Sequence, residues 1–429
     1  MKKNKPKPRT TNPQSPETAR LQPGSTDSDR PDALPMVPVR PEPRPLKPAR
    51  PESMPLEPVR PYPPELPDQI EQVNRTHNPR FVSEKLLAGD WLLLEDRYAT
   101  GLHLLSELKK RIFGKRKDHS DKDDSFLSYR QKRAIFRNAS NRLVVPVEKS
   151  RIALKKAPEI GWFDILYPEL PDFFLSFPQV QGLNSSWQWY RKGIRYSVLT
   201  HAIHPWYGVY FPTRHDHLLL FDEWLKSYGG SREKAVDVGT GCGVLAFQMI
   251  RHDFAQVVAL DVNPNAVLSV QEEITRQDLG HRLQVMVSDL FDGCPNLFHG
   301  FPKEKSDLVV FNPPWLPADS AGYAPDQISI LDRAVYHEKD LFERFFQQAG
   351  AYVNEKGRVL VFYSNLGRQS GSAVAHPVEQ ELTFNRRFRK VRHLRRKVRP
   401  PSRKTRRRDH RKKEWVELWE LAPCLVMEP

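Results

Sequence analysis

The stretch 234–243, KAVDVGTGCG, decides the fold, because an apolar strand ends there on an aspartate and runs into three alternate glycines. These glycines permit a tight turn and the close approach of a ligand to the backbone; they are Gly239, Gly241 and Gly243. A dinucleotide fingerprint would need its next glycine at position 244, where Val244 stands. A P-loop is excluded as well, since no Gly-Lys-Ser/Thr follows. The stretch therefore predicts a ligand site of another kind at the end of a buried strand.

Outward from this stretch, strand-like and helix-like segments alternate to the end of the chain. Further strands are predicted at 256–260, 283–289, 306–311 and 357–364. Helices are predicted at 243–252, 265–277 and 339–353. Short apolar strands separated by helices of this length indicate a doubly wound α/β fold, a parallel sheet with helices on both faces. Residues 414–421, EWVELWEL, alternate in polarity and are expected to complete an antiparallel hairpin.

Polar side chains follow four of these strands, and ligands of open α/β sheets bind beyond the carboxyl ends of the strands. The four are Asp237, Asp261, Asp289 and Asn312. A single acid at a strand end is more often a cap or a surface group, but four in register favour a site. Asp261 could bridge two ribose hydroxyls, and Asp289 could meet an adenine edge or its neighbouring backbone. Asn263 is a good N-cap for a helix that begins at Pro264.

The fourth strand end, residues 308–315, reads LVVFNPPW. Each proline fixes φ near −65° and removes a backbone N–H, so the segment is stiff, rich in acceptors and poor in donors. The Asn312 side-chain oxygen and the Pro313 carbonyl could accept both protons of a planar NH₂ group. Such bonds favour a more tetrahedral nitrogen whose lone pair is available for alkylation. Trp315 could stack on the target, and for a nucleic-acid base stacking contributes ~1–3 kcal/mol.

From Lys234 to about Leu421 the chain resembles the seven-stranded class I S-adenosylmethionine-dependent methyltransferases, whose sheet is Rossmann-like. DVGTGCGVLA is similar to their glycine-rich motif, ALDVNPNAV to their acidic second-strand motif, and FNPPW to the (N/D)PP(aromatic) motif of the amino-methylating branch. VYFPTRHDHLLL, upstream of the first strand, loosely resembles the element that precedes the sheet in protein-glutamine methyltransferases acting on release factors. Trp315 departs from the family pattern, in which tyrosine or phenylalanine is commoner at this position.

The resemblance implies S-adenosylmethionine as the cofactor and assigns roles to the motif residues. The cofactor-binding candidates are Asp237, Gly239, Thr240, Gly241, Gly243, Asp261, Asn263, Asp289 and Asn312. The catalytic candidates are Asn312, Pro313, Pro314 and Trp315. No metal is expected, because the three cysteines, Cys242, Cys294 and Cys424, are isolated and lack metal-type spacing.

In residues 1–228 the resemblance rests on no motif except VYFPTRHDHLLL, so the rest of this part is characterised by its composition and spacing. Nineteen of the 39 prolines fall in residues 1–67, where Arg-Pro recurs every ten residues. We expect residues 1–70 to be a largely disordered tail with polyproline-II character, either a spacer or a docking segment for readers of proline-rich peptides. A helical accessory region is expected at 71–150 and an aromatic accessory subdomain at 151–228. The methyltransferase-like domain would then span 229–424.

Five of the nine tryptophans lie in the aromatic region. We favour the core of a small subdomain for them over a base-stacking platform; they are Trp162, Trp187, Trp189, Trp206 and Trp224.

A basic segment at 386–413 holds 17 lysines and arginines against one acid, which exceeds the net charge of +15 for the whole chain. Arginine predominates, which favours bidentate phosphate contacts and a nucleic-acid partner. A disordered tail or a localisation signal is the alternative. No apolar run reaches the ~18 residues of a membrane helix, and the N-terminus lacks a secretory apolar region. We therefore expect a cytoplasmic protein with no membrane partner.

Three functions are compatible with the sequence. The favoured one is methylation of an exocyclic base amine of nucleic acid, RNA before DNA. The second is methylation of the glutamine amide of a protein substrate, with the basic segment binding a ribosome-associated partner. The third is a non-catalytic RNA-binding module on the same fold, which would need neither the glycine motif nor NPPW.

Overall fold

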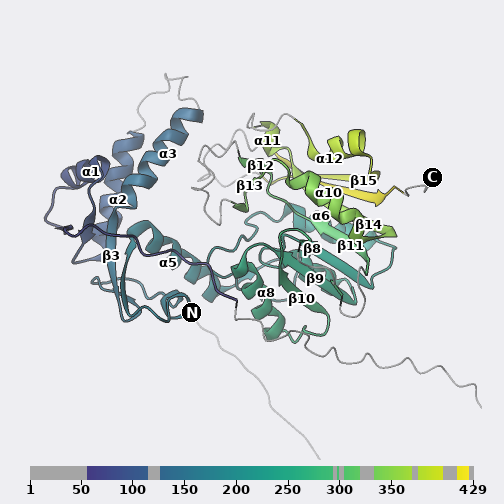
Figure 1. Ribbon diagram of the computed structural model, residues 1–429, viewed down its shortest axis with the longest axis horizontal. Coiled ribbons are helices and arrows are strands. Elements are labelled where there is room, and N and C mark those ends of the chain that lie inside the picture. Colours follow the sequence, from purple (N-terminus) through teal and green to yellow (C-terminus); the bar gives the residue numbers. More distant parts are fainter. Residues whose placement is uncertain are drawn as a thin grey trace, which may run out of the picture. The chain divides into compact units, whose positions relative to one another are not determined.

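The computed structural model (Figure 1) describes residues 56–114, 126–292, 297–298, 304–318, 333–369, 375–399 and 413–424. Its largest sheet has seven strands in the order β10-β9-β8-β11-β14-β16-β15. They are β8 (Lys234–Val238), β9 (Gln256–Asp261), β10 (Leu283–Val287), β11 (Ser306–Phe311), β14 (Val353–Ser364), β15 (Phe388–Lys397) and β16 (Trp415–Pro423). The first five in the sequence pair in parallel, and β16 is antiparallel to both its neighbours.

Helices cover both faces of this sheet, as the sequence predicted. One face packs against α6 (Asp216–Ser227), α7 (Val244–Arg251) and α8 (Pro264–Arg276). The other packs against α10 (Leu341–Tyr352), with Leu290, Phe291, Leu297 and Phe298 completing that core. Short elements finish the domain: α11 (Leu366–Gln369), α12 (Pro377–Gln380), the π-helical turn Glu381–Asn385, and the pairs β6 (Ile194–Arg195) with β7 (Ala202–Ile203) and β12 (Leu316–Pro317) with β13 (Tyr336–His337).

A second, five-stranded sheet organises the accessory domain. Its strands are β1 (Glu71–Val73), β2 (Leu92–Leu94), β3 (Leu143–Glu148), β4 (Arg151–Ile152) and β5 (Asp172–Ser176). Its helices are α1 (Pro79–Ala88), α2 (Tyr98–Phe113), α3 (Phe126–Ser140), α4 (Trp162–Leu166) and α5 (Phe177–Lys192). The predicted boundary at residue 150 falls between β3 and β4, which pair with each other. The segments on either side of it therefore share one sheet and one core.

The aromatic region divides between the two domains. Trp162 is buried in the core of the accessory domain, whereas Trp224 on α6 is buried under the seven-stranded sheet. Trp206 packs against both cores, and Trp189 is 42% exposed. The residues from about 194 to 228 thus add to the core of the large sheet, and tryptophan density alone could not show this division.

The proline-rich tail was predicted to extend to residue 70, but residues 56–70 belong to the folded structure. Leu56 packs against the core beneath the large sheet. The Pro61 carbonyl accepts a hydrogen bond of 2.6 Å from the buried Tyr167 hydroxyl. Proline prevents helix but leaves its carbonyl free to accept, so an extended segment can be fixed by side chains around it. The rest of the tail lies outside the described residues.

Much of the basic segment 386–413 is the edge strand β15, paired with β16 as the predicted hairpin. Four of its arginines form ion pairs inside the domain: Arg387 with Glu381, Arg392 with Glu420, Arg395 with Glu417 and Arg396 with Glu223. The expectation that the whole segment serves an acidic partner is therefore too broad. Arg389, Lys390, Lys397 and Arg399 form no ion pair among the described residues; 400–412 lie outside them.

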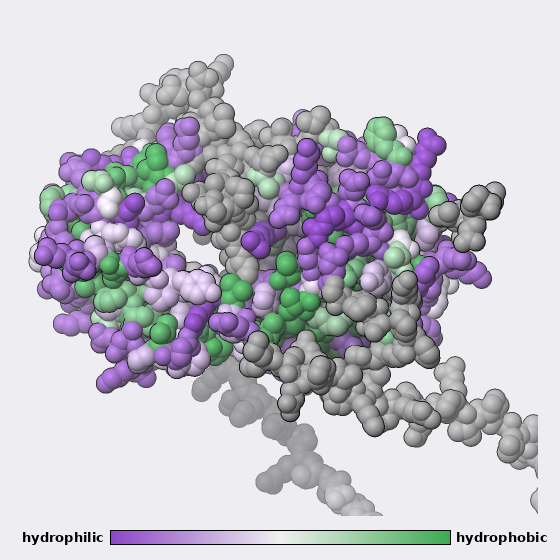
Figure 2. Space-filling model, in the orientation of Figure 1, coloured by the Kyte–Doolittle hydropathy of each residue, from purple (hydrophilic) through white to green (hydrophobic). Residues whose placement is uncertain are grey.

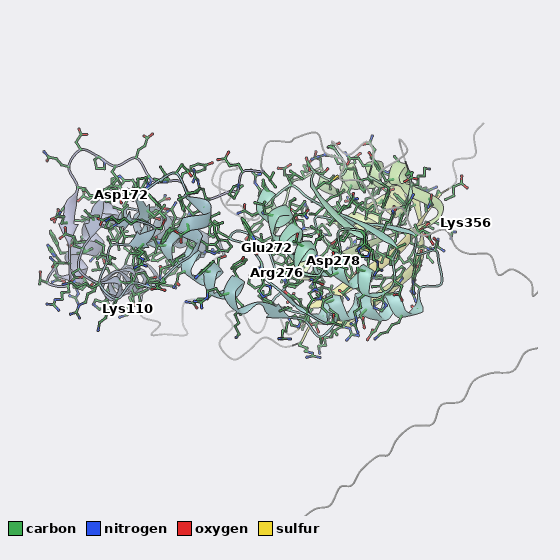
Figure 3. All side chains as sticks on the ribbon, turned by 90° about the horizontal axis from the view of Figure 1, so that it is seen from below. Lys110, Asp172, Glu272, Arg276, Asp278 and Lys356 are labelled. Atoms are coloured by element: carbon green, nitrogen blue, oxygen red, sulfur yellow. The ribbon has the colours of Figure 1, made fainter. Side chains whose placement is uncertain are left out.

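Hydrophilic residues predominate on the face shown in Figure 2, and hydrophobic ones gather only in small groups. Figure 3 shows the labelled side chains Glu272, Arg276 and Asp278, which come from α8 and the turn that follows it. Within the described ranges, no helix is both long and apolar enough to span a bilayer.

Glu420, a buried partner of the β15 arginines, should matter more to stability than Glu223 of α6, an exposed partner of the same strand. Its carboxylate is 8% exposed and accepts from Trp224 Nε1 at 2.8 Å, Arg392 Nε at 2.9 Å and Arg358 Nε at 3.2 Å. We expect Glu420→Gln to lower the free energy of unfolding by about 2 kcal/mol in urea titrations, because an amide group would face these donors. Glu223→Gln, at a 59% exposed carboxylate, should cost less than about 1 kcal/mol. Equal losses of unfolding free energy in the two variants would contradict the conclusion that buried ion pairs stabilise the hairpin more than exposed ones.

Candidate active site

The glycine turn after β8 is shaped by left-handed backbone angles. Gly239, Gly241 and Gly243 have φ of 66°, 54° and 80°. A Cβ on Gly243 would lie 2.9 Å from Phe247 and from Val270, so α7 starts in close contact with the turn. A Cβ on Gly239 would meet only Phe311, at 3.7 Å, within 4 Å. The turn is thus tightly packed at its helix end and open at its first glycine.

The Asp237 carboxylate stabilises the glycine turn through hydrogen bonds. Its Oδ2 accepts from the Thr240 hydroxyl at 2.6 Å and from the Ala246 backbone N–H at 3.1 Å. Its Oδ1 is buried and has no hydrogen-bond partner. Burial raises the pKa of this carboxyl to about 7. The two hydrogen bonds lower the pKa, but their effect is smaller than that of burial. Asp237 and Thr240, both predicted to bind cofactor, therefore act first on the shape of the turn.

Asp261 ends β9 and closes the turn from the second strand. Its Oδ2 accepts from the Gly241 N–H at 2.7 Å, and its Oδ1 from the Asn263 N–H at 2.8 Å. Burial raises the pKa of Asp261, opposed by these two backbone bonds. Asn263 caps α8, as predicted, by accepting from the Asn265 N–H at 3.0 Å, and it donates to the Gly208 carbonyl at 3.0 Å. Both side chains thus also fix backbone around the site.

Asp289 lies after β10 and is about half exposed. Its carboxylate forms an ion pair with Arg344 of α10, which also reaches Asp292 at 3.3 Å. The Asp289 hydrogen bond is the largest of the causes that raise the pKa of Arg344. The structure therefore gives Asp289 a partner that the sequence analysis did not anticipate, because it comes from a helix 55 residues away.

Asn312 lies next to the glycine turn. Strand β11 pairs with β8 in a register that sets Phe311 opposite Val238, so that Asn312 and Gly239 leave the sheet side by side. Asn312 Oδ1 and Trp315 Nε1 are buried without a hydrogen-bond partner. Pro313 is buried and Pro314 partly so. Since almost all buried polar atoms are paired in folded proteins, two such atoms within four residues indicate groups shaped for a ligand.

His217, on the first turn of α6, completes this group and was missed by the sequence analysis. Its ring stands edge-on to Trp315 at 6.0 Å and to Phe362 of β14 at 6.1 Å. Its Nε2 is buried and unpartnered, and burial lowers the pKa of the imidazole to about 3. It is therefore neutral at ordinary pH. A single histidine among leucines carries no periodic signal, and only its proximity to the NPPW loop singles it out.

The structure brings the glycine turn, Asp261 and Asn312 to adjacent strand ends, and it sets Asp289 one strand further out. An open cradle at Gly239, a carboxylate at Asp261 and the unpartnered oxygen of Asp237 suit a nucleoside with a cationic amino-acid tail. The residues present therefore fit S-adenosylmethionine. Among the residues the structure describes, no group of three His, Cys, Asp or Glu side chains is placed to hold a metal ion.

The strand order and this edge define a class of protein. Six strands that run in one direction, with the last strand of the sequence, β16, inserted antiparallel between β14 and β15, form the sheet of the class I methyltransferases. Residues 213–324 match the family described as Methyltransferase small domain. The chain thus carries a class I methyltransferase domain of the amino-methylating branch, and the resemblance predicted from the sequence is confirmed.

Particular relatives act on two kinds of NH₂ group. The chain is 30% identical over 150 residues to a ribosomal protein uL3 glutamine methyltransferase of Neisseria gonorrhoeae, covering 32% of this chain and 45% of that protein. It is 32% identical over 83 residues to a tRNA1(Val) (adenine(37)-N6)-methyltransferase of Parabacteroides distasonis, covering 19% and 33%. A release factor glutamine methyltransferase of Cereibacter sphaeroides is 26% identical over 150 residues, covering 34% and 50%.

The chain spans half or less of the length of these relatives. Among solved structures, a ribosomal protein L11 methylase from Lactobacillus delbrueckii subsp. bulgaricus aligns with a TM-score of 0.32 and 17% identity, over 52% of this chain and 86% of that one.

The buried Asp237 should make stability depend on pH. Between about 3.9, the pKa of an unfolded aspartate, and about 7 the folded protein retains a proton that the unfolded chain has lost. Stability of the wild type should therefore fall as pH rises through this window. Asp237→Asn lacks this ionisation, so its free energy of unfolding relative to wild type should rise from pH 4 and level off above pH 7.

Urea unfolding across this pH range would measure the difference, with Asp292→Asn, at a 60% exposed carboxylate, as the control. An offset between Asp237→Asn and wild type that is constant with pH would refute the buried protonated aspartate.

Proposed function

We propose that the protein is an enzyme that transfers a methyl group from S-adenosylmethionine to a planar NH₂ group. The observation that carries the proposal is Asn312 Oδ1, a buried acceptor without a partner beside the glycine turn. The relatives support it, because they methylate a glutamine amide or an adenine amine. A module that only binds RNA would not need a buried amide oxygen kept without a partner at this edge.

The residues that would hold the cofactor are those of the turn and the next strand. The open side of Gly239 and the left-handed turn admit the ligand against the backbone. Asp261 has lone pairs left for ribose hydroxyls, and Asp237 Oδ1 offers a buried acceptor to a cationic group. When bound, the cofactor supplies a methyl group on a positively charged sulfonium.

Asn312 and Pro313 would orient the acceptor nitrogen. Two hydrogen bonds from the NH₂ group, one to Asn312 Oδ1 and one to the Pro313 carbonyl, turn the nitrogen lone pair away from conjugation. The prolines hold these oxygens in place before the substrate arrives, which is the preorganisation that lowers a barrier most effectively. Trp315 offers its ring to a planar target, and the neutral His217 beside it adds a polar atom that carries no charge.

An exocyclic amine of RNA is the substrate that we favour. The adenine methyltransferase among the relatives and the unpaired cations of β15 support it. A base in a duplex would have to leave the stack to reach Asn312, so a single strand or a loop is expected. A protein glutamine amide is the second candidate, supported by longer matches to glutamine methyltransferases. Both substrate classes, and the translation-related relatives, are consistent with a cytoplasmic location.

Incubation of the protein with tritiated S-adenosylmethionine and cell extract would test the function and identify the substrate. Label lost on ribonuclease treatment would establish RNA, and label lost on protease treatment would establish the glutamine alternative. Absence of label from both the RNA and the protein fraction would refute the proposal that the protein is a methyltransferase.

Asn312→Ala should lower turnover by about 100-fold or more, the usual effect of removing one preorganised hydrogen-bonding group. Donor affinity, measured by calorimetry, should change by less than about threefold, because the acceptor nitrogen and not the cofactor is the partner of this oxygen. Asn312→Asp, which keeps an oxygen acceptor of the same shape, serves as the matched control and should retain more activity. Unchanged turnover in Asn312→Ala would refute the proposed role of Asn312.

Arg389→Glu with Lys390→Glu should weaken RNA binding most at low salt. Two lost phosphate contacts would reduce the slope of log affinity against log salt by about 2. Lys155→Glu with Lys156→Glu gives the same change in net charge on exposed residues of the accessory domain. RNA affinities measured from 50 to 200 mM salt separate local phosphate contacts at β15 from an effect of net charge. Equal losses of affinity in the two double variants would show that only the overall charge matters.

A further inference from the structure

A buried amide side chain clamps the backbone of the proline-rich segment at Val59. Asn265, fully buried in the first turn of α8, accepts from the Val59 N–H at 2.8 Å and donates to the Val59 carbonyl at 2.7 Å. The second amide proton goes to the Tyr207 carbonyl at 2.7 Å. Removal of the segment would leave Asn265 Oδ1 and one of the two Nδ2 protons without a partner, and an unsatisfied buried polar group costs about 1–3 kcal/mol. The clamp is therefore built for an extended peptide.

The next residue, Arg60, fills a pocket of the accessory domain. Its guanidinium donates to the Leu166 carbonyl and forms an ion pair with Glu169. Its carbon Cζ lies 5.0 Å from the centre of the Tyr167 ring, and only 16% of the side chain is exposed. The ion pair raises the pKa of Arg60 and lowers that of Glu169. Carbonyl, carboxylate and aromatic face together select an arginine, whose planar fork lysine does not reproduce.

The contacts continue along the segment. The Tyr167 hydroxyl donates to the Pro61 carbonyl at 2.6 Å, and Gln179 donates to the Tyr62 carbonyl at 3.5 Å. Pro58-Val59-Arg60-Pro61 is thus read by backbone bonds at Val59 and Pro61 and by a side-chain pocket at Arg60. Polyproline-like peptides lose little entropy on binding, which is why proline-rich sequences serve as recognition motifs elsewhere.

The same tetrapeptide occurs a second time in the sequence, as Pro38-Val39-Arg40-Pro41. Neither the methyl transfer nor the seven-stranded sheet accounts for a surface with this selectivity. We propose that Asn265, Tyr167, Leu166 and Glu169 form a recognition site for peptides of the sequence Pro-Val-Arg-Pro. Residues 58–61 are its resident ligand, and a second Pro-Val-Arg-Pro peptide takes their place when they leave it.

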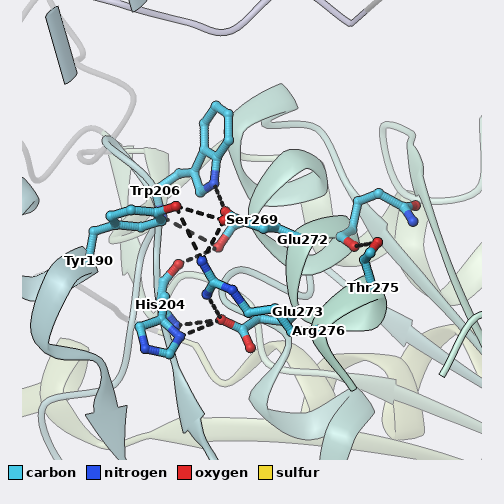
Figure 4. A network of polar contacts seen from close by, with 9 residues as sticks. Tyr190, His204, Trp206, Ser269, Glu272, Glu273, Thr275 and Arg276 are labelled. Atoms are coloured by element: carbon cyan, nitrogen blue, oxygen red, sulfur yellow. Dashed lines mark hydrogen bonds and ion pairs between the residues drawn. The ribbon is translucent and has the colours of Figure 1, made fainter. Parts of the chain in front are cut away.

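Replacement of residues 58–61 by another peptide would break contacts that join the methyltransferase domain to the accessory domain. The Val59 bonds are made to α8 of the methyltransferase domain, whereas the bonds of Arg60 and Pro61 are made to the accessory domain. A second link between α5 and α8 does not involve the segment (Figure 4): Tyr190 donates to Glu272 at 2.6 Å, and Arg276 of α8 contacts both. Release of residues 58–61 would therefore loosen the domains without separating them.

A labelled peptide of residues 56–64, LEPVRPYPP, tests the site by fluorescence anisotropy on the full chain. The resident segment competes at the high effective concentration of a tethered ligand, ~1 mM, so wild type should bind the peptide weakly. Arg60→Glu removes the pocket contact and Val59→Pro removes the N–H that Asn265 accepts. Either variant should bind the peptide at least tenfold more tightly than wild type. Arg151→Glu, at an exposed arginine of the accessory domain, should behave as wild type.

Further peptides, and a variant at Tyr167 of the proposed recognition site, test the sequence specificity of binding. A peptide of residues 36–44, MVPVRPEPR, should bind the Arg60→Glu chain comparably, whereas LEPVEPYPP and a scrambled sequence should not bind. Tyr167→Phe, combined with Arg60→Glu, removes only the hydroxyl that bonds Pro61 and should weaken the peptide several-fold. Failure of both Arg60→Glu and Val59→Pro to bind the first peptide, or equal binding of the scrambled one, would overturn the proposal. These assays use neither cofactor nor methyl transfer, so their failure would leave the proposed function untouched.

Discussion

The hydrogen bonds that Asp237 accepts from the Thr240 hydroxyl and from the N–H of Ala246 fix the turn on which the rest of the site depends. They tie the strand β8, the glycine turn and the first turn of α7 into one unit. The Gly241 N–H then meets Asp261 from the second strand, and the parallel register sets Asn312 beside Gly239. A buried carboxylate is costly, and here the cost accompanies left-handed backbone angles at Gly239, Gly241 and Gly243, a conformation that favours glycine.

Charge on the molecule serves two purposes that composition cannot separate. Arginines of β15 pair with buried carboxylates on β16 and with an exposed carboxylate on α6, and they hold the last hairpin to the sheet. Arg389, Lys390 and Lys397 form no ion pair among the described residues and lie on an edge strand, where charge also prevents pairing with another sheet edge. The described part of the basic segment is therefore partly internal structure and partly surface. Within that part, unpaired cations such as Arg389 and Lys390 are the ones that can contribute to a polyanion site.

The parts predicted from the sequence are those that local pattern determines. Short apolar runs, separated by segments of helical length, located the parallel strands of the large sheet and their helices, and alternating polarity located its last strand. The strand ends located the glycine turn, Asp261 and Asn312. The contacts that the sequence did not predict are made across long separations. His217 meets Trp315 from a helix upstream of the sheet, Arg344 reaches Asp289 from α10, and Asn265 binds Val59 over 206 residues. No local spacing encodes such pairs.

The segment 56–62 shows why low complexity does not imply absence of structure. Its composition offers no apolar core, which is the usual reason for disorder, yet it needs none, because buried side chains of two domains supply its partners. The gain comes from satisfying Asn265 and Tyr167, which would otherwise be buried without partners. Proline lowers the entropy lost on fixing the segment. A sequence that cannot fold alone thus becomes a specific ligand of its own chain, and any peptide with the same four residues presents the same groups.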